Sequence, residues 1–215
     1  MVRLATNKDL AGIAKVHSLC FPDSYSSHLR KFNNFLGGGN LLEKFYLEYY
    51  KDVPELFIVA TNESDEVIGF CMGYYMNNDT QTQRFLSTYK LSLLWKTFLL
   101  IVSGNKPTWN KVIDRFKHKP TVNDWTIINT KYEHITNDDR GDLLSVCILP
   151  EYRGKGYSQQ LMEKFLLSMK QQKKICLLSV KTDNIQARRY YERNGFELYR
   201  IRGEEGVTYI KALNS

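Results

Sequence analysis

The chain has 215 residues, a formal net charge of +7, and 43% hydrophobic and 25% charged residues. This length predicts a single α/β domain over residues 1–215, and the composition excludes a disordered chain and a polytopic membrane protein. The longest apolar run, 91–102, is far shorter than the roughly 20 residues that cross a bilayer, so it predicts a surface-lying segment rather than a membrane span.

The cysteines and histidines form no recognisable metal or disulfide pattern. The cysteines are Cys20, Cys71, Cys147 and Cys176. The histidines are His17, His28, His118 and His134. Neither set has CxxC, Cys/His or i, i+4 spacing, so we expect thiols in a reducing compartment and no metal site. The N-terminus lacks an apolar segment followed by a small-residue cleavage site, which predicts a cytoplasmic protein.

The positive charge is concentrated in one segment. Residues 84–119 hold eight basic residues and one acidic residue, and the rest of the chain is neutral. Such a block indicates an anionic partner, for instance a nucleotide, a phosphorylated substrate, a lipid headgroup or a nucleic acid. A solvated helix face explains the block equally well. No recognised nucleic-acid module accompanies it, so we expect no specific nucleic-acid partner.

The first part of the chain alternates strand and helix patterns. A short strand at 2–5 precedes a helix whose apolar residues recur at helical spacing after Asn7. The aromatic-rich stretch 41–50 predicts a second helix. Apolar runs at 55–60 and 66–76 flank a polar turn and predict an antiparallel hairpin.

A basic helical insertion then interrupts this alternation at 77–140. Helical patterns occur near 84–103 and 108–118, and Gly104 and Pro107 separate them. We assign the insertion to the same domain, because about 60 residues is marginal for an independent core.

From residue 143 the chain reads strand, helix, strand, helix, strand, strand. The predicted elements are a strand at 143–149, a helix at 157–172, a strand at 175–180, a helix at 184–195, and strands at 196–202 and 206–213. The apolar run 175–180 is typical of a central strand, so its link to the strand at 143–149 should be a right-handed parallel crossover. The fold class is therefore α/β, with a mixed central sheet flanked by helices.

A glycine-bearing loop, 150–158, leads from a strand into a helix. The start of that helix presents unpaired N–H groups and the positive end of the helix dipole. Gly154 and Gly156 let the backbone approach a phosphate closely, while Arg153 and Lys155 add positive charge. We therefore expect a pyrophosphate to bind here. The loop matches neither the Walker pattern nor the dinucleotide fingerprint, which excludes ATPase and Rossmann interpretations.

Two motifs resemble those of the GNAT superfamily of N-acetyltransferases. Arg153, Gly156 and Ser158 have the spacing of its acetyl-coenzyme A motif, with serine in place of a glycine or alanine. The second motif resembles the helix that follows in this superfamily. Its residues are Asn184, Ala187, Tyr191, Gly195 and Phe196. This helix comes after the expected intervening strand, and the two motifs together make the resemblance strong.

The resemblance implies the GNAT fold, with the helical insertion between the third and fourth strands, and acetyl-CoA as cosubstrate. In that superfamily the strand before the loop holds the pantetheine, the loop amides hold the pyrophosphate, and the second motif contacts the pantetheine arm and sulfur. The cofactor-binding residues that it implies are Val146, Cys147, Ile148, Arg153, Gly154, Lys155, Gly156, Tyr157, Ser158, Asn184, Ala187 and Tyr191.

The resemblance also implies catalytic roles. Tyr191 is the expected general acid for the departing thiolate, and packing against the coenzyme arm is its alternative role. Asn184 can hydrogen-bond the pantetheine and also cap a helix. The attacking amine must be neutral, so a base or a water chain is needed. Relatives that acetylate protein N-termini often carry a glutamate where this chain has Ser179, so we consider Asp142 and Glu133 as substitutes.

The predicted function is acetyl transfer from acetyl-CoA to a primary amine. The basic insertion favours a small anionic acceptor, such as a nucleotide-linked amino sugar, over a polybasic peptide. A protein or peptide N-acetyltransferase is the alternative enzyme. Outside the enzymes, the alternative is a non-catalytic coenzyme-binding or membrane-surface module, with 84–119 contacting an anionic surface.

Overall fold

The computed structural model describes residues 1–28, 40–75, 80–106, 108–109, 125–132, 134–202 and 206–213. Its strands are β1 (Val2–Leu4), β2 (Phe57–Thr61), β3 (Val67–Tyr75), β4 (Trp125–Ile127), β5 (Arg140–Ile148), β6 (Ile175–Lys181), β7 (Glu197–Arg202) and β8 (Gly206–Ala212). Its α-helices are α1 (Leu10–Cys20), α2 (Tyr25–His28), α3 (Leu41–Tyr50), α4 (Thr80–Val102), α6 (Tyr157–Lys170) and α7 (Ile185–Arg193). Short 3-10 helices lie at Asn7–Asp9, Pro54–Leu56, Thr130–Tyr132, Asn137–Asp139 and Pro150–Tyr152.

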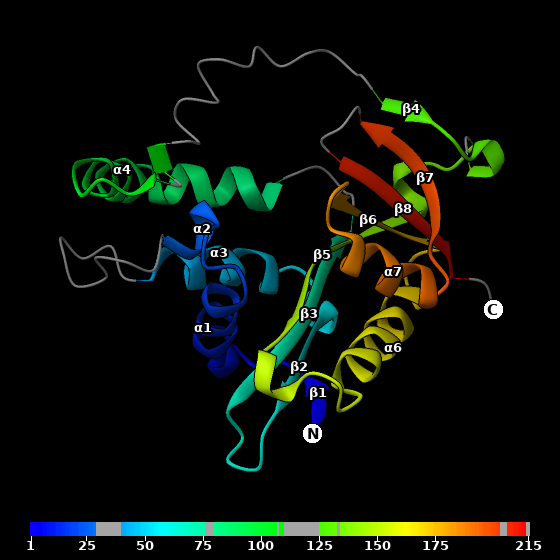
Figure 1. Ribbon diagram of the computed structural model, residues 1–215, viewed down its shortest axis with the longest axis horizontal. Helices are drawn as coiled ribbons and strands as arrows, with labels where there is room; N and C mark the ends of the chain where they lie inside the picture. Colours follow the sequence, from blue (N-terminus) through cyan, green and yellow to red (C-terminus); the bar gives the residue numbers. More distant parts are fainter. Residues whose placement is uncertain are drawn as a thin grey trace.

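The eight strands form one mixed sheet in the order β1-β2-β3-β5-β6-β8-β7-β4 (Figure 1). Every neighbouring pair is antiparallel except β5 and β6, which are parallel and are linked through α6. The mixed sheet with flanking helices confirms the predicted fold class. The parallel pairing of β5 with β6 is also confirmed.

Helices cover both sides of the β2-β3-β5 part of the sheet. Figure 1 shows α1 and α3 on one side and α6 and α7 on the other. Every residue of β2 is buried, which explains its nearly continuous apolar sequence. Helix α6 buries Leu161, Met162, Phe165 and Met169, which recur at helical spacing and form one face against the sheet.

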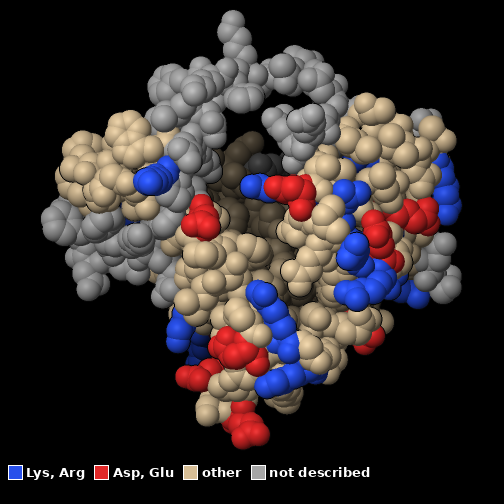
Figure 2. Space-filling view, in the orientation of Figure 1, with Lys and Arg blue, Asp and Glu red and all other residues tan. Residues whose placement is uncertain are grey.

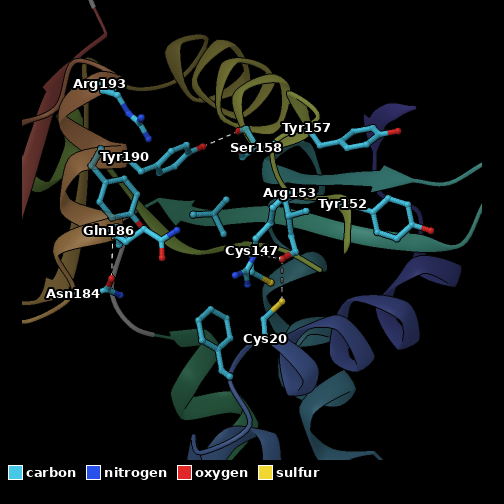
Figure 3. A pocket seen from close by; sticks show the side chains of 16 residues that line it. Cys20, Cys147, Tyr152, Arg153, Tyr157, Ser158, Asn184, Gln186, Tyr190 and Arg193 are labelled. Atoms are coloured by element: carbon cyan, nitrogen blue, oxygen red, sulfur yellow. Dashed lines mark hydrogen bonds between the residues drawn. The ribbon is translucent and has the colours of Figure 1, made fainter. Parts of the chain in front are cut away.

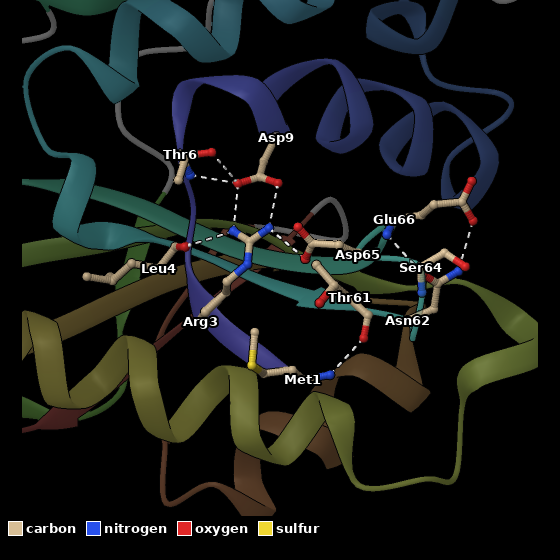
Figure 4. A network of polar contacts seen from close by, with 10 residues as sticks. All are labelled: Met1, Arg3, Leu4, Thr6, Asp9, Thr61, Asn62, Ser64, Asp65 and Glu66. Atoms are coloured by element: carbon tan, nitrogen blue, oxygen red, sulfur yellow. Dashed lines mark hydrogen bonds and ion pairs between the residues drawn. The ribbon is translucent and has the colours of Figure 1, made fainter.

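A cluster of polar contacts fixes the N-terminal strand (Figure 4). The Arg3 guanidinium donates to both carboxylate oxygens of Asp9, at 2.8 and 3.0 Å, and to Asp65 at 3.0 Å. Burial alone would raise the pKa of Asp9, but Arg3 and the Thr6 N–H hold it below its ordinary value. These bonds connect β1 to the start of α1 and to the turn between β2 and β3.

The insertion is only partly the helical segment that the sequence predicts. Helix α4 confirms the helix near 84–103, whereas residues 110–118 of the second predicted helix lie outside the described residues. The insertion also contains a strand that the sequence did not predict, because Trp125–Ile127 form β4 and pair with β7. Tryptophan, threonine and isoleucine all favour extended backbone. The insertion thus adds an edge strand, and the strand that follows it is fifth in chain order.

Among the described residues, α4 is one helix that is long and apolar enough, by length and composition, to cross a membrane. It has 23 residues, its most apolar window has a mean hydropathy of 1.3, and 17% of that window is buried. The sequence-based argument from length did not consider the whole helix. It counted only the run 91–102, whereas the helix already begins at Thr80.

The first part of α4 is tied to α3. Arg84 Nε donates to Oε2 of the buried Glu48 at 2.6 Å, and Arg84 Nη2 donates to both carboxylate oxygens of Asp52 at 3.1 Å. Phe85 is buried in an apolar cluster with α3 residues. At Tyr89 the backbone leaves helical geometry, with φ −109° and ψ 17°. Helix α4 therefore consists of an anchored first part and a second part beyond a kink.

Candidate active site

The two parallel strands of the sheet separate part-way along their length. Strands β5 and β6 pair only from Arg140 and Ile175 to Asp142 and Leu177. Beyond that point β5 still pairs with β3, and β6 still pairs with β8. A wedge opens between the two strands. Backbone polar groups of Val146–Ile148 that face this wedge have no strand partner on that side, so they can bind an extended ligand.

A pocket of about 430 Å³ occupies this wedge (Figure 3). The end of β5, the loop before α6, helix α7 and the end of α1 all contribute to it. Its lining residues are Cys20, Phe21, Val146, Cys147, Ile148, Tyr152, Arg153, Gly154, Tyr157, Ser158, Asn184, Gln186, Ala187, Tyr190, Tyr191 and Arg193. The described lining contains two arginines and no carboxylate, which suits an anionic ligand.

The loop before α6 has the backbone geometry of an anion site. Gly154 and Gly156 have φ values of 76° and 81°, in the left-handed region that glycine adopts without strain. A Cβ added at Gly154 would meet no atom within 4 Å, so the backbone there is open to a guest. Gly156 is the N-cap of α6, and the N–H groups of the first helical turn have no partner within the helix.

Helix α7 forms the opposite wall. Asn184 is its N-cap, and its side-chain oxygen accepts from the Ala187 N–H at 3.1 Å. The Tyr190 hydroxyl donates to the Ser158 carbonyl oxygen at 2.7 Å, as Figure 3 shows. This bond connects the middle of α7 to the first turn of α6, so it holds the two walls at a fixed separation.

Tyr191 lines the pocket from a buried position. It is 8% exposed, and its ring packs edge-on against Phe196 at a centroid distance of 6.0 Å and tilted against Tyr209 at 6.4 Å. Burial raises the pKa of the Tyr191 phenol above its ordinary value. The hydroxyl therefore keeps its proton at neutral pH and can donate it as a hydrogen bond.

Two cysteines lie on the α1 side of the pocket. The Cys20 thiol donates to the Ile148 carbonyl oxygen at 3.5 Å, and Figure 3 shows it pointing toward the same part of the pocket as Cys147. The Cys147 thiol, followed by the positive charge of Arg153, lowers the pKa of Cys20. Burial raises the pKa of Cys147. The end of α1 therefore contributes two residues to the pocket, Cys20 and Phe21, and the Cys20 thiol contacts the end of β5.

A polar cluster lies one helical turn before Cys20. The two ring nitrogens of His17 lie 2.5 Å from the Tyr46 hydroxyl and 3.1 Å from the Ser26 hydroxyl. Burial lowers the pKa of His17 to about 4, so the ring is neutral at physiological pH. Burial raises the pKa of Tyr46. Both side chains are thus uncharged hydrogen-bonding groups behind the pocket wall.

Comparison with known proteins identifies the domain to which this wedge belongs. Residues 126–198 match the family model of the acetyltransferase (GNAT) domain, and this segment contains β5, the loop, α6, β6 and α7. Residues 126–198 thus belong to a GNAT acetyltransferase domain. No curated protein matches the sequence.

Solved structures agree with this identification at the level of the fold. An N-acetyltransferase from Staphylococcus aureus Mu50 is 17% identical, with a TM-score of 0.59 over 98% of this chain and 100% of that one. The yncA protein from Salmonella typhimurium, solved with its cofactor acetyl-CoA, is 12% identical, with a TM-score of 0.53 over 100% and 94% of the two chains. A chain of the NatC complex bound to Gag peptide and CoA is 12% identical, with a TM-score of 0.52 over 100% and 98%. These similarities show the GNAT fold.

The predicted GNAT resemblance is confirmed, and with it the expectation of acetyl-CoA as cosubstrate. The match to the domain model, the fold and the pocket together indicate an acetyltransferase of the GNAT type that depends on acetyl-CoA. Among the described residues, no group of three or more His, Cys, Asp or Glu side chains could hold a metal ion.

Most of the residues that the GNAT motifs imply come together in the pocket. Ten line it, namely Val146, Cys147, Ile148, Arg153, Gly154, Tyr157, Ser158, Asn184, Ala187 and Tyr191. Two do not. Gly156 is the N-cap of α6, and the Lys155 amine lies 5.1 Å from the ring centroid of Tyr152, which does line the pocket. That these residues bind the coenzyme stays a prediction.

The two candidate bases have different outcomes. Asp142 lies where β5 and β6 begin to separate, but it is not among the residues that line the pocket, and its carboxylate pairs with Arg140 at 3.2 Å. Burial raises the pKa of Asp142. That Asp142 acts as a base stays a prediction. Glu133 lies outside the described residues.

Other pocket residues were not predicted from the sequence. These are Cys20, Phe21, Tyr152, Gln186, Tyr190 and Arg193. Helical spacing from Asn184 could have indicated those on α7, because a pocket-facing helix presents a whole stripe. Nothing local to Cys20 or Phe21 indicates that the end of α1 reaches a strand more than a hundred residues later.

Proposed function

We propose that the chain transfers the acetyl group of acetyl-CoA to the primary amine of a small anionic molecule, for instance a nucleotide-linked amino sugar. The observation that carries the proposal is the wedge between β5 and β6, which is continuous with the glycine loop at the start of α6. A long ligand with an anionic end and a thioester end fits such a site. Its pyrophosphate would lie on the loop and its pantetheine arm along β5.

The chain's own groups suggest how the coenzyme is bound. The N–H groups around Gly154 and the first turn of α6 would donate to the pyrophosphate, where the helix dipole also favours negative charge. Backbone groups of Val146–Ile148 would pair with the amides of the pantetheine arm. Arg193 would add positive charge from α7.

In the proposed reaction the amine nitrogen attacks the thioester carbonyl carbon. A carbon–nitrogen bond forms, the carbon–sulfur bond breaks, and the sulfur leaves as a thiolate. Tyr191 donates its proton to this thiolate and is reprotonated from solvent, while the acylated nitrogen releases its extra proton to solvent. Burial raises the pKa of the Tyr191 phenol, so the proton is in place before the thiolate forms.

Among the residues that the structure describes, no carboxylate lines the pocket, and we propose that the amine loses its proton to water before it reaches the thioester. The rate at low acceptor concentration should then rise with pH towards the pKa of the amine, near 10 for an alkylamine. The domain would act mainly by holding the neutral amine against the thioester carbonyl.

The acceptor class rests on charge. Residues 84–119 are strongly basic in sequence, and the described part of the pocket lining has two arginines and no acid. This charge would attract a phosphorylated acceptor and repel a polybasic peptide. A cytoplasmic location belongs to the same proposal, since all four cysteines are free thiols.

A peptide acceptor is the second candidate. One solved structure with the same fold is bound to Gag peptide and CoA, which motivates testing peptides. Against this, β6 carries Ser179, whose hydroxyl lies 3.1 Å from that of Thr208, where protein N-acetyltransferases often have a glutamate.

The test measures thiol release from acetyl-CoA with nucleotide amino sugars, simple amines and N-terminal peptides as acceptors. Selective turnover of a phosphorylated amine supports the proposal, and selective turnover of a peptide replaces it with the second candidate. Coenzyme binding without turnover of any acceptor, in wild type and Tyr191→Phe alike, would instead indicate a non-catalytic coenzyme-binding module.

A further inference from the structure

The second part of α4 carries an exposed apolar stripe. It consists of Leu91, Leu94, Trp95, Phe98 and Val102, which recur at i, i+3, i+4, i+7 and i+11. Their exposed fractions are 82%, 60%, 36%, 53% and 68%. The rings of Trp95 and Phe98 stack with their centroids 5.6 Å apart. In most soluble domains a stripe with this spacing faces the core.

The side of α4 away from the stripe is the packed side. Lys96 and Leu100, one turn apart, are 2% and 1% exposed. Leu93 packs against the apolar cluster that α4 shares with α3. The apolar stripe is therefore not a core-facing side that has come away from the domain, because a different side of α4 packs against the domain. The helix has a packed side and, separately, an exposed apolar side of a size that marks an interaction surface.

Basic residues flank the stripe. Lys90 and Lys106, just before and just after it, are both exposed. The sequence contains no acidic residue from 80 to 113. Figure 2 shows the described surface on the α4 side as mostly tan, with basic blue on the helix. An apolar stripe with lysines at its rim has the two features that bind a membrane surface, namely buried apolar area and attraction to anionic headgroups.

We propose that α4 binds the protein to the surface of an anionic phospholipid membrane. The stripe lies at the boundary between headgroups and acyl chains, with Trp95 at the depth that tryptophan favours. Lys90 and Lys106 contact the headgroups.

The helix lies on the membrane rather than across it. Its first part is held on α3 by the pair Arg84–Glu48 and by the buried Phe85. Beyond the kink at Tyr89, residues 90–102 extend about 20 Å at the rise of an α-helix. A bilayer core is about 30 Å thick, so this part is too short to span it.

A second copy of the chain is a less suitable occupant than a membrane. A twofold contact through the stripe would bring the same basic rim, with Lys90 and Lys106, from both copies together. Nothing acidic on α4 would compensate that repulsion. An anionic lipid surface instead complements the rim.

The test is sedimentation of the full chain with vesicles of phosphatidylcholine mixed with phosphatidylserine, and with vesicles of phosphatidylcholine alone. We expect binding to the anionic vesicles that weakens at high salt, and little binding to the neutral ones. The double variant Leu94→Glu/Phe98→Glu should lower the affinity at least tenfold, because both charges enter the interface.

Leu167→Glu is the matched control, since Leu167 on α6 is 64% exposed and Leu94 is 60% exposed. It should bind vesicles like wild type. All variants are checked for unchanged acetyl-CoA affinity, which shows that they are folded and keeps this test separate from the proposed enzymatic function. Three results would each overturn the proposal: no sedimentation of wild type with anionic vesicles, equal binding by the α4 variant, or a dimer in solution that the variant dissociates without any vesicle binding.

Discussion

The Tyr190 hydroxyl donates a hydrogen bond to the carbonyl oxygen of Ser158 across 2.7 Å. The two residues are 32 positions apart, and each lines the pocket from a different helix. Tyr190 belongs to the middle of α7 and Ser158 to the first turn of α6. The separation of the two walls therefore depends on one phenol, and burial raises the pKa of that phenol so that it stays a donor.

Tyr190→Phe should weaken acetyl-CoA binding without greatly changing the chemical step. The variant loses the tie between the walls but keeps the ring, so we expect KM for acetyl-CoA to rise several-fold and kcat to change less than threefold, since a neutral hydrogen bond contributes about 1 kcal/mol. Steady-state kinetics measure both values. Tyr75→Phe is the control, because it removes a hydroxyl bond to Glu55 of 3.0 Å outside the pocket lining. Equal effects of the two variants would contradict the role of Tyr190.

Gly154→Ala should lower the affinity for acetyl-CoA at least tenfold. The added methyl group points into open space beside the pocket, where the pyrophosphate would lie, and a φ of 76° strains an alanine by about 1 kcal/mol. Gly104→Ala is a close control, because Gly104 has a φ of 72° and equally open surroundings beyond the end of α4. The two variants should lose similar stability in thermal unfolding. Only Gly154→Ala should lose coenzyme binding by calorimetry.

Tyr191→Phe should act on the chemical step. Without a phenolic proton the thiolate leaves unassisted, so we expect kcat to fall about a hundredfold with little change in acetyl-CoA affinity. Rate and binding are measured on the same preparation. A variant with near wild-type kcat and weaker binding would instead show that Tyr191 only packs against the coenzyme arm.

Local sequence patterns predicted the β5–loop–α6 unit and the α7 helix well. An apolar run that ends before two glycines and an amphipathic stretch specifies a strand, a loop and a helix without help from distant residues. The position of Asp142 could not be predicted in this way. Asp142 lies at the last paired position of β5 and β6, and how far these two strands stay paired comes from tertiary packing.

The insertion 77–140 also contains features that local sequence patterns do not predict. Its helical periodicity predicted α4, but the extended residues Trp125–Ile127 are too few to be recognised as a strand without their partner β7. The stripe on α4 was equally ambiguous, since its spacing alone predicts a core-facing helix. Only the packing of Lys96 and Leu100 shows that the stripe faces outward.

His17 should make the fold sensitive to mild acid. Its pKa is about 4 in the folded chain and near 6.5 when unfolded, so only the unfolded state gains a proton as the pH falls from 6.5 towards 4. The stabilisation is complete above pH 6.5 and is lost progressively below it. We expect a loss of about 2 kcal/mol in the free energy of unfolding at pH 5 relative to pH 7.5 from this residue.

His17→Gln provides the comparison for this prediction. Glutamine can still bond the Tyr46 and Ser26 hydroxyls but does not titrate in this range. Urea unfolding between pH 5 and 7.5 should therefore show a smaller pH dependence for the variant than for wild type. If the free energy of unfolding changed with pH equally in the variant and in wild type, another group would cause the acid sensitivity.

The most direct test of the account is calorimetric titration of the full chain with acetyl-CoA. The wedge between β5 and β6 and the glycine loop predict saturable binding of one coenzyme per chain, weakened at least tenfold by Gly154→Ala but not by Gly104→Ala. No detectable binding of acetyl-CoA by the folded wild-type chain would contradict the assignment of the pocket and the acetyl transfer proposed for it.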